Sequence, residues 1–244
     1  LDTFAKNLQE TQPTVFFAVP RIWTKFQMGI LSKIPQEKLS KLLKIPVLSW
    51  VLKRKFKKAL GLSKARSIVS GAAPLQETQR TWFRKIGVSI TNGYGMTENC
   101  AITTHLGDGI IDKPGSVGLA QPGVELKIDS ETSEILMRGP FMMKEYYKQP
   151  ELTAEVIKES WLHTGDQGHI DADGFLFITG RVKDIFKTSK GKYIEPLVLE
   201  GYFGDILEFE QICVAGLGLA QPICLGVLSE IGLAKPKDEL QKYL

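Results

Sequence analysis

The sequence predicts an α/β protein: part of a parallel α/β sheet domain, followed by an antiparallel, β-barrel-like subdomain and the start of a small α+β C-terminal domain. Three observations predict this architecture. Residues 65–91 follow a strand–helix–strand pattern, short strands separated by Gly and Pro turns come next, and a lysine-rich polar segment begins at residue 181. The expected divisions are therefore residues 1–106, 107–180 and 181–244, the last of them incomplete.

The first expected elements are a strand and a series of helices. Val15–Val19, with the sequence VFFAV, is a compact apolar run closed by Pro20, which is typical of a buried strand. Residues 21–60 have helical character, and Pro35 and Pro46 are expected to break this stretch into separate helices.

A pair of parallel strands is expected next. Ala65–Ser70 predicts a short buried strand, Leu75–Ile86 predicts a helix with one apolar face, and Val88–Thr91 predicts a second strand. A helix between two strands at this spacing implies that the strands are parallel. The loops that follow the two strands then leave the same edge of the sheet, where open α/β sheets bind ligands.

Beyond residue 106 the sequence is rich in short strands. The expected elements are strands at 124–129, 134–138, 169–171 and 175–179 and a helix at 150–159. The uncharged run of 19 residues at Gln211–Ser229 has the length of a membrane span. Its internal Gln, Pro and Gly residues instead favour two strands, 212–216 and 223–228, joined by a turn.

The composition is that of a folded globular protein. The 244 residues are 43% apolar and 24% charged, which excludes disordered, collagen-like and coiled-coil proteins. Cys100, Cys213 and Cys224 are too widely spaced to indicate a disulfide framework or a zinc site, and they favour a reducing compartment. No signal peptide is visible and the chain does not begin with Met, so we expect a cytoplasmic piece of a longer protein.

Positive charge is concentrated in the expected helices. Residues 25–66 contain twelve Lys or Arg and one acid, Glu37, for a charge of +11, whereas the whole chain carries +4. A solvated helical surface explains this pattern, and so does an anionic partner. Because apolar residues alternate with the basic ones, the partner expected on the second interpretation is a membrane, contacted peripherally at its inner face through Lys25–Arg66. No nucleic-acid-binding motif is present, so no nucleic acid partner is expected.

Two loops at the expected sheet edge have the composition of a ligand site. Ser70–Pro74 consists of small residues that let a flat ligand approach the main chain, although a tight turn needs the same residues. In Asn92–Glu98, two glycines flank Tyr94, whose ring could stack on a base. Thr97 could bond a phosphate oxygen and Glu98 could hold Mg²⁺. The alternative is a glycine-rich turn in which Thr97 and Glu98 cap a helix.

Two later motifs contain further candidate side chains. Asp166 lies at a glycine turn and could accept hydrogen bonds from two ribose hydroxyls, or it could simply be a turn residue. Arg181 could clamp a phosphate or a ribose. The neighbouring Lys183 and Asp184 could equally form an exposed ion pair. His163 is expected to be structural.

The order of four motifs resembles the adenylate-forming, or AMP-binding, superfamily of acyl-CoA synthetases, peptide-synthetase adenylation domains and luciferases. These motifs are SGAAPL, NGYGMTEN, WLHTGDQG and GRVKDIFKTSKGK. The resemblance extends from Pro13 to about Ser229. Within the superfamily, the AVPRIW block at Ala18–Trp23 and the PELTAE motif are similar to the long-chain fatty-acid–CoA ligase branch.

This resemblance implies a two-step reaction with fatty acid, ATP and CoA as substrates and Mg²⁺ as cofactor. The fatty acid attacks the α-phosphate of ATP to give acyl-AMP and pyrophosphate, and the CoA thiol then displaces AMP to give the thioester. The residues that the resemblance places at the nucleotide are Ser70, Gly71, Ala72, Ala73, Pro74, Asn92, Gly93, Tyr94, Gly95, Met96, Thr97, Asp166 and Arg181.

The resemblance also implies roles for single residues. Tyr94 is expected to stack on adenine, Thr97 to contact a phosphate and Glu98 to hold Mg²⁺. Asp166 is expected to bind the ribose hydroxyls, and Arg181 to reach the same ribose. The expected catalytic residues are Thr97, Glu98, Lys183 at the hinge of the C-terminal domain, and Lys187 in the second step.

Two elements of the family pattern are missing from this sequence: an upstream Ser/Thr/Gly-rich phosphate loop and a C-terminal lysine. We therefore expect an internal fragment of a ligase that does not complete adenylation alone. One alternative is an acyl-AMP ligase that loads a carrier protein. Another is an inactive nucleotide- or lipid-binding module anchored by residues 25–66. The sequence leaves the fatty-acid chain length and the oligomeric state open.

Overall fold

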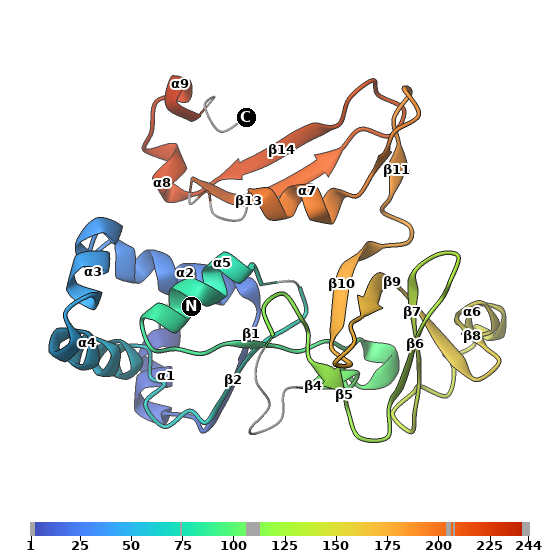
Figure 1. Ribbon diagram of the computed structural model, residues 1–244, viewed down its shortest axis with the longest axis horizontal. Helices are drawn as coiled ribbons and strands as arrows, with labels where there is room; N and C mark the ends of the chain where they lie inside the picture. Colours follow the sequence, from blue (N-terminus) through green and yellow to red (C-terminus); the bar gives the residue numbers. More distant parts are fainter. Residues whose placement is uncertain (1–2, 74, 106–112, 204–205, 207, 241–244) are drawn as a thin grey trace. The chain divides into compact units, whose positions relative to one another are not determined.

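The computed structural model describes residues 3–73, 75–105, 113–203, 206 and 208–240, which Figure 1 colours in sequence order. The chain divides into two compact units, a first unit at Leu1–Leu119 and a second unit at Ala120–Leu244. The first contains a parallel sheet with helices and the second contains antiparallel sheets, so the predicted α/β class is confirmed. The expected three-part division of the chain stays a prediction.

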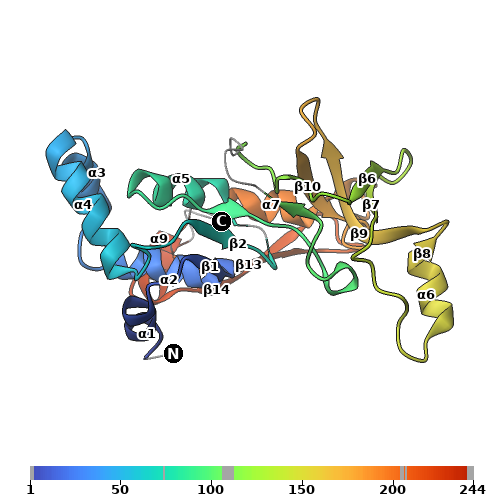
Figure 2. The same ribbon diagram turned by 90° about the horizontal axis from the view of Figure 1, so that it is seen from below.

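The first unit begins with four helices and one strand: α1 (Phe4–Thr11), β1 (Val15–Ala18), α2 (Pro20–Leu31), α3 (Gln36–Leu43) and α4 (Pro46–Ala59). Its other elements are β2 (Ser67–Ser70), α5 (Glu77–Lys85), β3 (Thr91–Asn92), the 3₁₀ helix η1 (Thr97–Asn99), β4 (Thr104–His105) and β5 (Leu119–Ala120). Prolines start α2 and α4, where their fixed φ suits a helix and no N–H is needed. The expected breaks at Pro35 and Pro46 are therefore confirmed, and Figures 1 and 2 both show α3 and α4 side by side.

The parallel sheet has the strand order β1-β2-β3. Ala18 lies opposite Ser70, and Ser70 lies opposite Asn92, so the three strands end at one edge. This confirms that the two candidate loops leave neighbouring strand ends. The third strand is shorter than the expected Val88–Thr91, because only its last residue and Asn92 pair with β2. Val88 instead closes the turn after α5, where its N–H bonds a carbonyl of that helix.

One face of β1 is exposed. Phe16 and Ala18 are buried, whereas Val15 is 65% exposed and Phe17 is 59% exposed. The prediction of a buried strand is therefore wrong for this face, because alternate side chains of a strand point to opposite sides and only one side meets the core. That core includes Phe16, Ala18, Trp23, Leu39, Leu62, Ile68, Phe83, Ile86 and Val88.

The second unit is built on an antiparallel sheet. Its elements are β6 (Glu125–Ile128), β7 (Glu134–Arg138), α6 (Pro150–Val156), β8 (Ile157–Lys158), β9 (Trp161–Ile170) and β10 (Leu176–Arg181). The strand order is β10-β9-β7-β6, with β8 paired to β9, which confirms the antiparallel arrangement. Strand β9 is much longer than the expected 169–171, because it pairs with three other strands along its length. Ile135, Met137, Leu162 and Leu176 are fully buried in this unit.

The rest of the second unit contains β11 (Phe186–Lys187), β12 (Tyr193–Ile194), α7 (Pro196–Tyr202), β13 (Phe209–Ala215), β14 (Ile223–Leu228), α8 (Glu230–Leu233) and α9 (Lys237–Leu240). The uncharged run forms the hairpin β13–β14, which confirms the prediction of two strands. Among the described residues, no helix combines the length and apolar character needed to cross a membrane. The three cysteines are free thiols.

Candidate functional site

The loops that follow β2 and β3 leave neighbouring strand ends, and a main-chain hydrogen bond joins the second loop to the last residue of β2. We call these loops, residues 71–73 and 93–96, the glycine loops. The N–H of Gly93 donates to the carbonyl of Ser70 at 2.8 Å. A Cβ on Gly71 would lie 2.8 Å from the ring of Phe17 and 3.3 Å from the carbonyl oxygen of Gly93. Glycine at position 71 therefore lets the loops approach each other.

Small exposed residues follow Gly71. Ala72 and Ala73 are exposed, and Ala72 has a φ of 67°. A positive φ is uncommon for a residue with a side chain and persists only where the surroundings hold it. The exposed main chain offers N–H and C=O groups to a flat ligand, as the composition of the loop predicts. Pro74, the last predicted residue of this loop, lies outside the described residues.

Ser70 ends β2 with a fully buried hydroxyl. Within the described part of the chain, its Oγ has no hydrogen-bond partner. Buried polar groups are almost always paired, so a ligand atom or an ordered water is expected to satisfy this hydroxyl. The observation fits a polar ligand that reaches the end of β2, where Ser70 was predicted to contact a nucleotide.

Tyr94 is held by its main chain. Its N–H donates to the Thr104 hydroxyl at 3.3 Å, and its carbonyl accepts from the N–H groups of Thr103 and Thr104 at 3.2 Å. Tyr94 is only 9% exposed, so a stacked base would contact a small part of the ring. A Cβ on Gly95 would overlap the main chain of Ala101, which explains why the loop needs a second glycine.

The short helix η1 contains the two predicted phosphate and metal contacts. Thr97 is exposed and Glu98 is half-buried. The turn is capped by Asn99, whose Oδ1 accepts from the Met96 N–H at 2.9 Å and whose Nδ2 donates to the Thr103 hydroxyl at 2.6 Å. The capping role considered for Thr97 and Glu98 therefore belongs to a residue that the sequence analysis did not select.

Glu98 is the predicted ligand for Mg²⁺. Over the described ranges, no three His, Cys, Asp or Glu side chains gather as a metal site. Mg²⁺ that is bound to substrate phosphates commonly takes only one or two protein carboxylates. A half-buried carboxylate beside a threonine hydroxyl fits that donor set, and the metal role of Glu98 stays a prediction.

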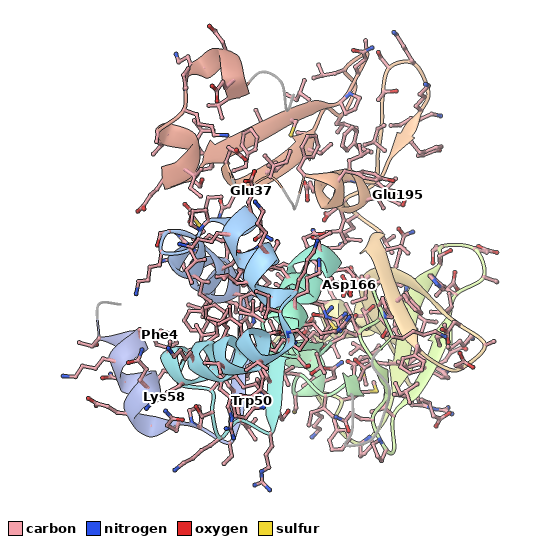
Figure 3. The ribbon with its side chains drawn as sticks, turned by 60° about the vertical axis from the view of Figure 1, so that its left-hand side comes forward. Phe4, Glu37, Trp50, Lys58, Asp166 and Glu195 are labelled. Carbon is pink, nitrogen blue, oxygen red and sulfur yellow. The ribbon has the colours of Figure 1, made fainter. Side chains whose placement is uncertain are left out.

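In the second unit, Asp166 and Arg181 are paired. They lie opposite each other on β9 and β10, and Arg181 Nε donates to Asp166 Oδ1 at 2.9 Å. The Asp166 side chain, labelled in Figure 3, is 13% exposed, and that of Arg181 is 60% exposed. A carboxylate has about four acceptor positions, so the pair is compatible with additional bonds from ribose hydroxyls. We call residues 163–166 and Arg181 the Asp166 turn.

Glu134, the first residue of β7, holds the Asp166 turn. Its Oε1 accepts from the Gly165 N–H at 2.8 Å, and its Oε2 lies 2.8 Å from His163 Nδ1. Gly165 has a φ of 74°, and the hydrogen bond from its N–H fixes this left-handed position next to Asp166. The Thr164 hydroxyl also donates to a carbonyl of β7 at 2.7 Å.

Sequence reasoning did not identify Glu134. It lies 31 residues from Gly165, and no local pattern marks it as a partner of the turn. Only the pairing of β7 with β9 brings the two together. The contact with Glu134 supports the structural role expected for His163.

Lys183 and Lys187 follow β10. Lys183 is exposed, and Lys187 lies in β11 with its Nζ 5.1 Å from the centroid of the Tyr193 ring. Gly191, in the turn between β11 and β12, has a φ of 81°. The hinge role of Lys183 and the second-step role of Lys187 stay predictions.

Residues 1–147 match the family described as AMP-binding enzyme. The chain is 34% identical over 232 residues to a Mycobacterium tuberculosis protein named, provisionally, as a fatty-acid–CoA ligase, covering 81% of this chain and 40% of the relative. It is 33% identical over 245 residues to long chain acyl-CoA synthetase 2 of Arabidopsis thaliana, covering 86% of this chain and 37% of the relative. The chain therefore spans less than half the length of these curated relatives.

The fold is shared with solved structures of other enzymes. An anthranilate CoA ligase in complex with anthranoyl-AMP matches with a TM-score of 0.73 and 23% identity, covering 100% of this chain and 45% of that chain. That level of identity shows the fold alone. The A domain of the carboxylic acid reductase from Segniliparus rugosus, in complex with AMP and a co-purified carboxylic acid, matches with a TM-score of 0.70 and 26% identity, covering 100% of this chain and 41% of that chain.

Proposed function

This chain belongs to the AMP-binding enzyme family, and from this premise we propose that it forms the nucleotide-binding part of an adenylate-forming acyl-CoA ligase. The finer proposal is a long-chain fatty-acid–CoA ligase, which the names of relatives support. The observation that carries the proposal is the pair of glycine loops at neighbouring strand ends, where Gly93 of the second loop bonds Ser70, the last residue of β2. Parallel α/β sheets bind nucleotides at this edge.

The proposed reaction has two displacements. A carboxylate oxygen of the fatty acid attacks the α-phosphorus of ATP, and the bond to pyrophosphate breaks. The thiol sulfur of CoA then attacks the acyl carbon, the thiol proton is released, and AMP leaves with the electron pair of the broken C–O bond. Reactions of this kind depend mainly on positioning and on stabilisation of charge, so residues that hold the nucleotide contribute directly to the rate.

In the first unit, the proposed role of the glycine loops is to hold adenine and the phosphates. The exposed main chain at Ala72 and Ala73 can meet the flat face and edge of the base, and Ser70 supplies an unpaired hydroxyl within the described residues. The exposed Thr97 hydroxyl can donate to a phosphate oxygen. Glu98 would hold Mg²⁺, which when bound withdraws negative charge from the phosphates.

In the second unit, the proposed role of the Asp166 turn is to hold the ribose. The Asp166 carboxylate can accept hydrogen bonds from ribose hydroxyls, while Arg181 donates to Oδ1 and fixes the carboxylate. Glu134 is a positioning residue in this proposal, because its two carboxylate oxygens contact the Gly165 N–H and His163 Nδ1 of the Asp166 turn.

The acyl acceptor separates this proposal from its nearest alternative. Relatives named as acyl-CoA synthetases favour CoA, whereas a carrier-protein loading enzyme would transfer the same acyl-adenylate to a phosphopantetheine thiol. Product analysis after supply of an acyl-adenylate with either CoA or a holo-carrier protein distinguishes the two. A chain that binds the adenylate and transfers to neither acceptor would favour the alternative of an inactive nucleotide- or lipid-binding module.

Calorimetric titration with a non-hydrolysable long-chain acyl-adenylate tests the nucleotide site. We expect saturable binding that Asp166→Ala weakens by about 1–3 kcal/mol, the range for lost hydrogen bonds to a charged group. Asp173→Ala, in an exposed hairpin turn, serves as the matched control. Equal affinity in the wild type and Asp166→Ala would remove Asp166 from the site. A folded chain that binds no adenylate would contradict the proposal for this part of the protein.

A further inference from the structure

Helix α4 carries a continuous exposed stripe. Val47, Trp50, Arg54 and Lys58 recur at intervals of three and four residues, so they lie along one face of the helix. All four are exposed, with Val47 at 77% and Trp50 at 59%. Figure 3 shows α4 at the front of the view with Trp50 and Lys58 labelled. We call these four residues the α4 stripe.

The opposite face of α4 packs into the first unit. Ser49 and Phe56 are buried, and Phe56 belongs to the hydrophobic core. The methylene stem of Lys53 lies over Gly87, since a Cβ added there would come within 2.9 Å of it. The helix is therefore anchored on one side, and the α4 stripe lies on the side that faces away from this core.

The α4 stripe changes character along the helix. Its N-terminal end is apolar, with Ile45 at 53% exposure preceding Val47 and Trp50. Its C-terminal end is basic, and residues 46–59 contain five Lys or Arg and no acid. The neighbouring helix α3 contains two exposed lysines, Lys38 and Lys41, and one exposed acid, Glu37.

A cation–π contact links the two ends of the stripe. The guanidinium carbon of Arg54 lies 4.4 Å from the centroid of the Trp50 ring. This contact holds an aromatic ring and a cation together at the surface. Tryptophan favours the boundary between lipid headgroups and acyl chains, and clustered Lys and Arg are attracted to anionic lipids. The phosphate backbone of a nucleic acid would match the cations but would leave the exposed apolar end without a partner.

We propose that the α4 stripe docks this chain on an anionic membrane surface. Val47 and Trp50 enter the headgroup region, and Arg54 and Lys58 pair with lipid phosphates or carboxylates. An interfacial helix of this kind buries its apolar side chains roughly 5–10 Å deep and depends on both apolar area and charge. On this proposal, part of the positive charge of residues 25–66 belongs to a membrane-binding surface and is not only a solvated face.

Vesicle co-sedimentation tests this proposal on the full chain. The vesicles are phosphatidylcholine alone, or phosphatidylcholine with about one third phosphatidylserine, at about 0.1 M salt. The variants are Arg54→Glu with Lys58→Glu, and separately Val47→Ser with Trp50→Ser. The matched control is Lys144→Glu with Lys148→Glu, which changes the net charge equally at exposed positions of the second unit. Circular dichroism establishes that each variant is folded.

We expect binding to the anionic vesicles and little binding to the neutral ones. The double charge reversal in the α4 stripe should weaken binding by about tenfold or more, since each basic residue near the surface contributes on the order of a fivefold preference. The apolar pair should weaken binding by a similar factor, and the control should bind as the wild type does.

Three results would overturn the proposal. The first is equal binding to both vesicles. The second is an equal loss in the α4 variant and the control, which would indicate net charge without a specific surface. The third is full binding by Val47→Ser with Trp50→Ser together with displacement by heparin, which would indicate an acidic macromolecule as the partner of this surface.

Discussion

The glycine loops of the first unit and the Asp166 turn of the second unit are built from different kinds of contact. In the glycine loops, main-chain groups make the closest approaches: Gly93 bonds the Ser70 carbonyl, and Gly95 lies against the main chain of Ala101. The Asp166 turn is held by side chains, with Glu134 and Arg181 as its partners. A side chain added at Gly95 should therefore disturb the glycine loops, whereas loss of the Glu134 carboxylate should disturb the Asp166 turn.

The largest expected effect is that of Gly95→Ala. A Cβ at this position overlaps the main chain of Ala101, which cannot rotate away as a side chain would, so we expect a loss of about 3 kcal/mol in the free energy of unfolding. Gly165→Ala is the matched variant in the second unit. It has open space around its Cβ and only the cost of its positive φ, about 1–2 kcal/mol.

Urea unfolding of both variants, followed by tryptophan fluorescence and circular dichroism, measures this difference. The comparison fails if Gly165→Ala costs as much as Gly95→Ala, because steric contact in the glycine loops would then not be the distinguishing feature.

The next effect is that of Glu134→Ala. This change leaves the Gly165 N–H and His163 without their carboxylate partner, and a hydrogen bond to a charged group contributes about 1.5–3 kcal/mol. We expect a loss of about 2 kcal/mol in the free energy of unfolding, together with weaker binding of an acyl-adenylate. Glu134→Gln keeps one acceptor oxygen, so its free energy of unfolding should lie between those of the wild type and Glu134→Ala.

Glu131→Ala is the control for Glu134, since it removes an exposed carboxylate from the same hairpin. In denaturant unfolding and adenylate titration, the stability and the adenylate affinity of this variant should be close to those of the wild type. A Glu134→Ala protein that is destabilised but binds the adenylate normally would show that Glu134 maintains the sheet without positioning Asp166.

The smallest expected effect is that of replacing Asp129, whose side chain bonds only neighbouring residues in the turn between β6 and β7. Asp129 Oδ1 accepts hydrogen bonds from the Thr132 N–H at 2.9 Å, the Thr132 hydroxyl at 2.8 Å and the Glu131 N–H at 3.1 Å. The Thr132 main-chain bond is the main reason that the pKa of Asp129 lies below its ordinary value of 3.8. A lowered pKa means that the charged carboxylate stabilises the fold above pH 3.8 and loses this effect as the pH falls through the pKa of the folded state.

Asp129→Asn tests this linkage. Thermal unfolding at neutral pH should show the wild type slightly more stable than the variant, and the difference should close as the pH falls below 3.8. A difference that is constant across this range would mean that the charge of Asp129 does not contribute. Because the residue lies at the surface, the effect should be smaller than that of Glu134→Ala.

Local features of the sequence predicted much of the first unit. The helices break at the expected prolines, and β2 ends at Ser70 as the small-residue motif implies. The glycine loops could be located because a parallel strand pair with a helix crossover places both loops at one edge. Each of these signals lies in the same continuous segment of chain as the structure that it specifies.

Other features depend on contacts between distant segments. The exposed side of β1 could not be predicted, because the apolar run VFFAV gives no indication of which face meets the core. The shortening of the third strand depends on its register with β2, and the length of β9 depends on the three strands that pair with it. Asn99 took the capping role because the η1 turn folds back onto Thr103.

By itself, the sequence determined the α/β class, the order of the four motifs, and the position of Tyr94, Thr97 and Glu98 directly after one strand, since all of these follow from residues that are near each other in the chain. Only the tertiary structure decided that Glu134 holds the Asp166 turn and that Arg181 reaches Asp166. The physical reason is that strand pairing converts a separation of 31 residues into a hydrogen bond of 2.8 Å, and no local propensity records that pairing.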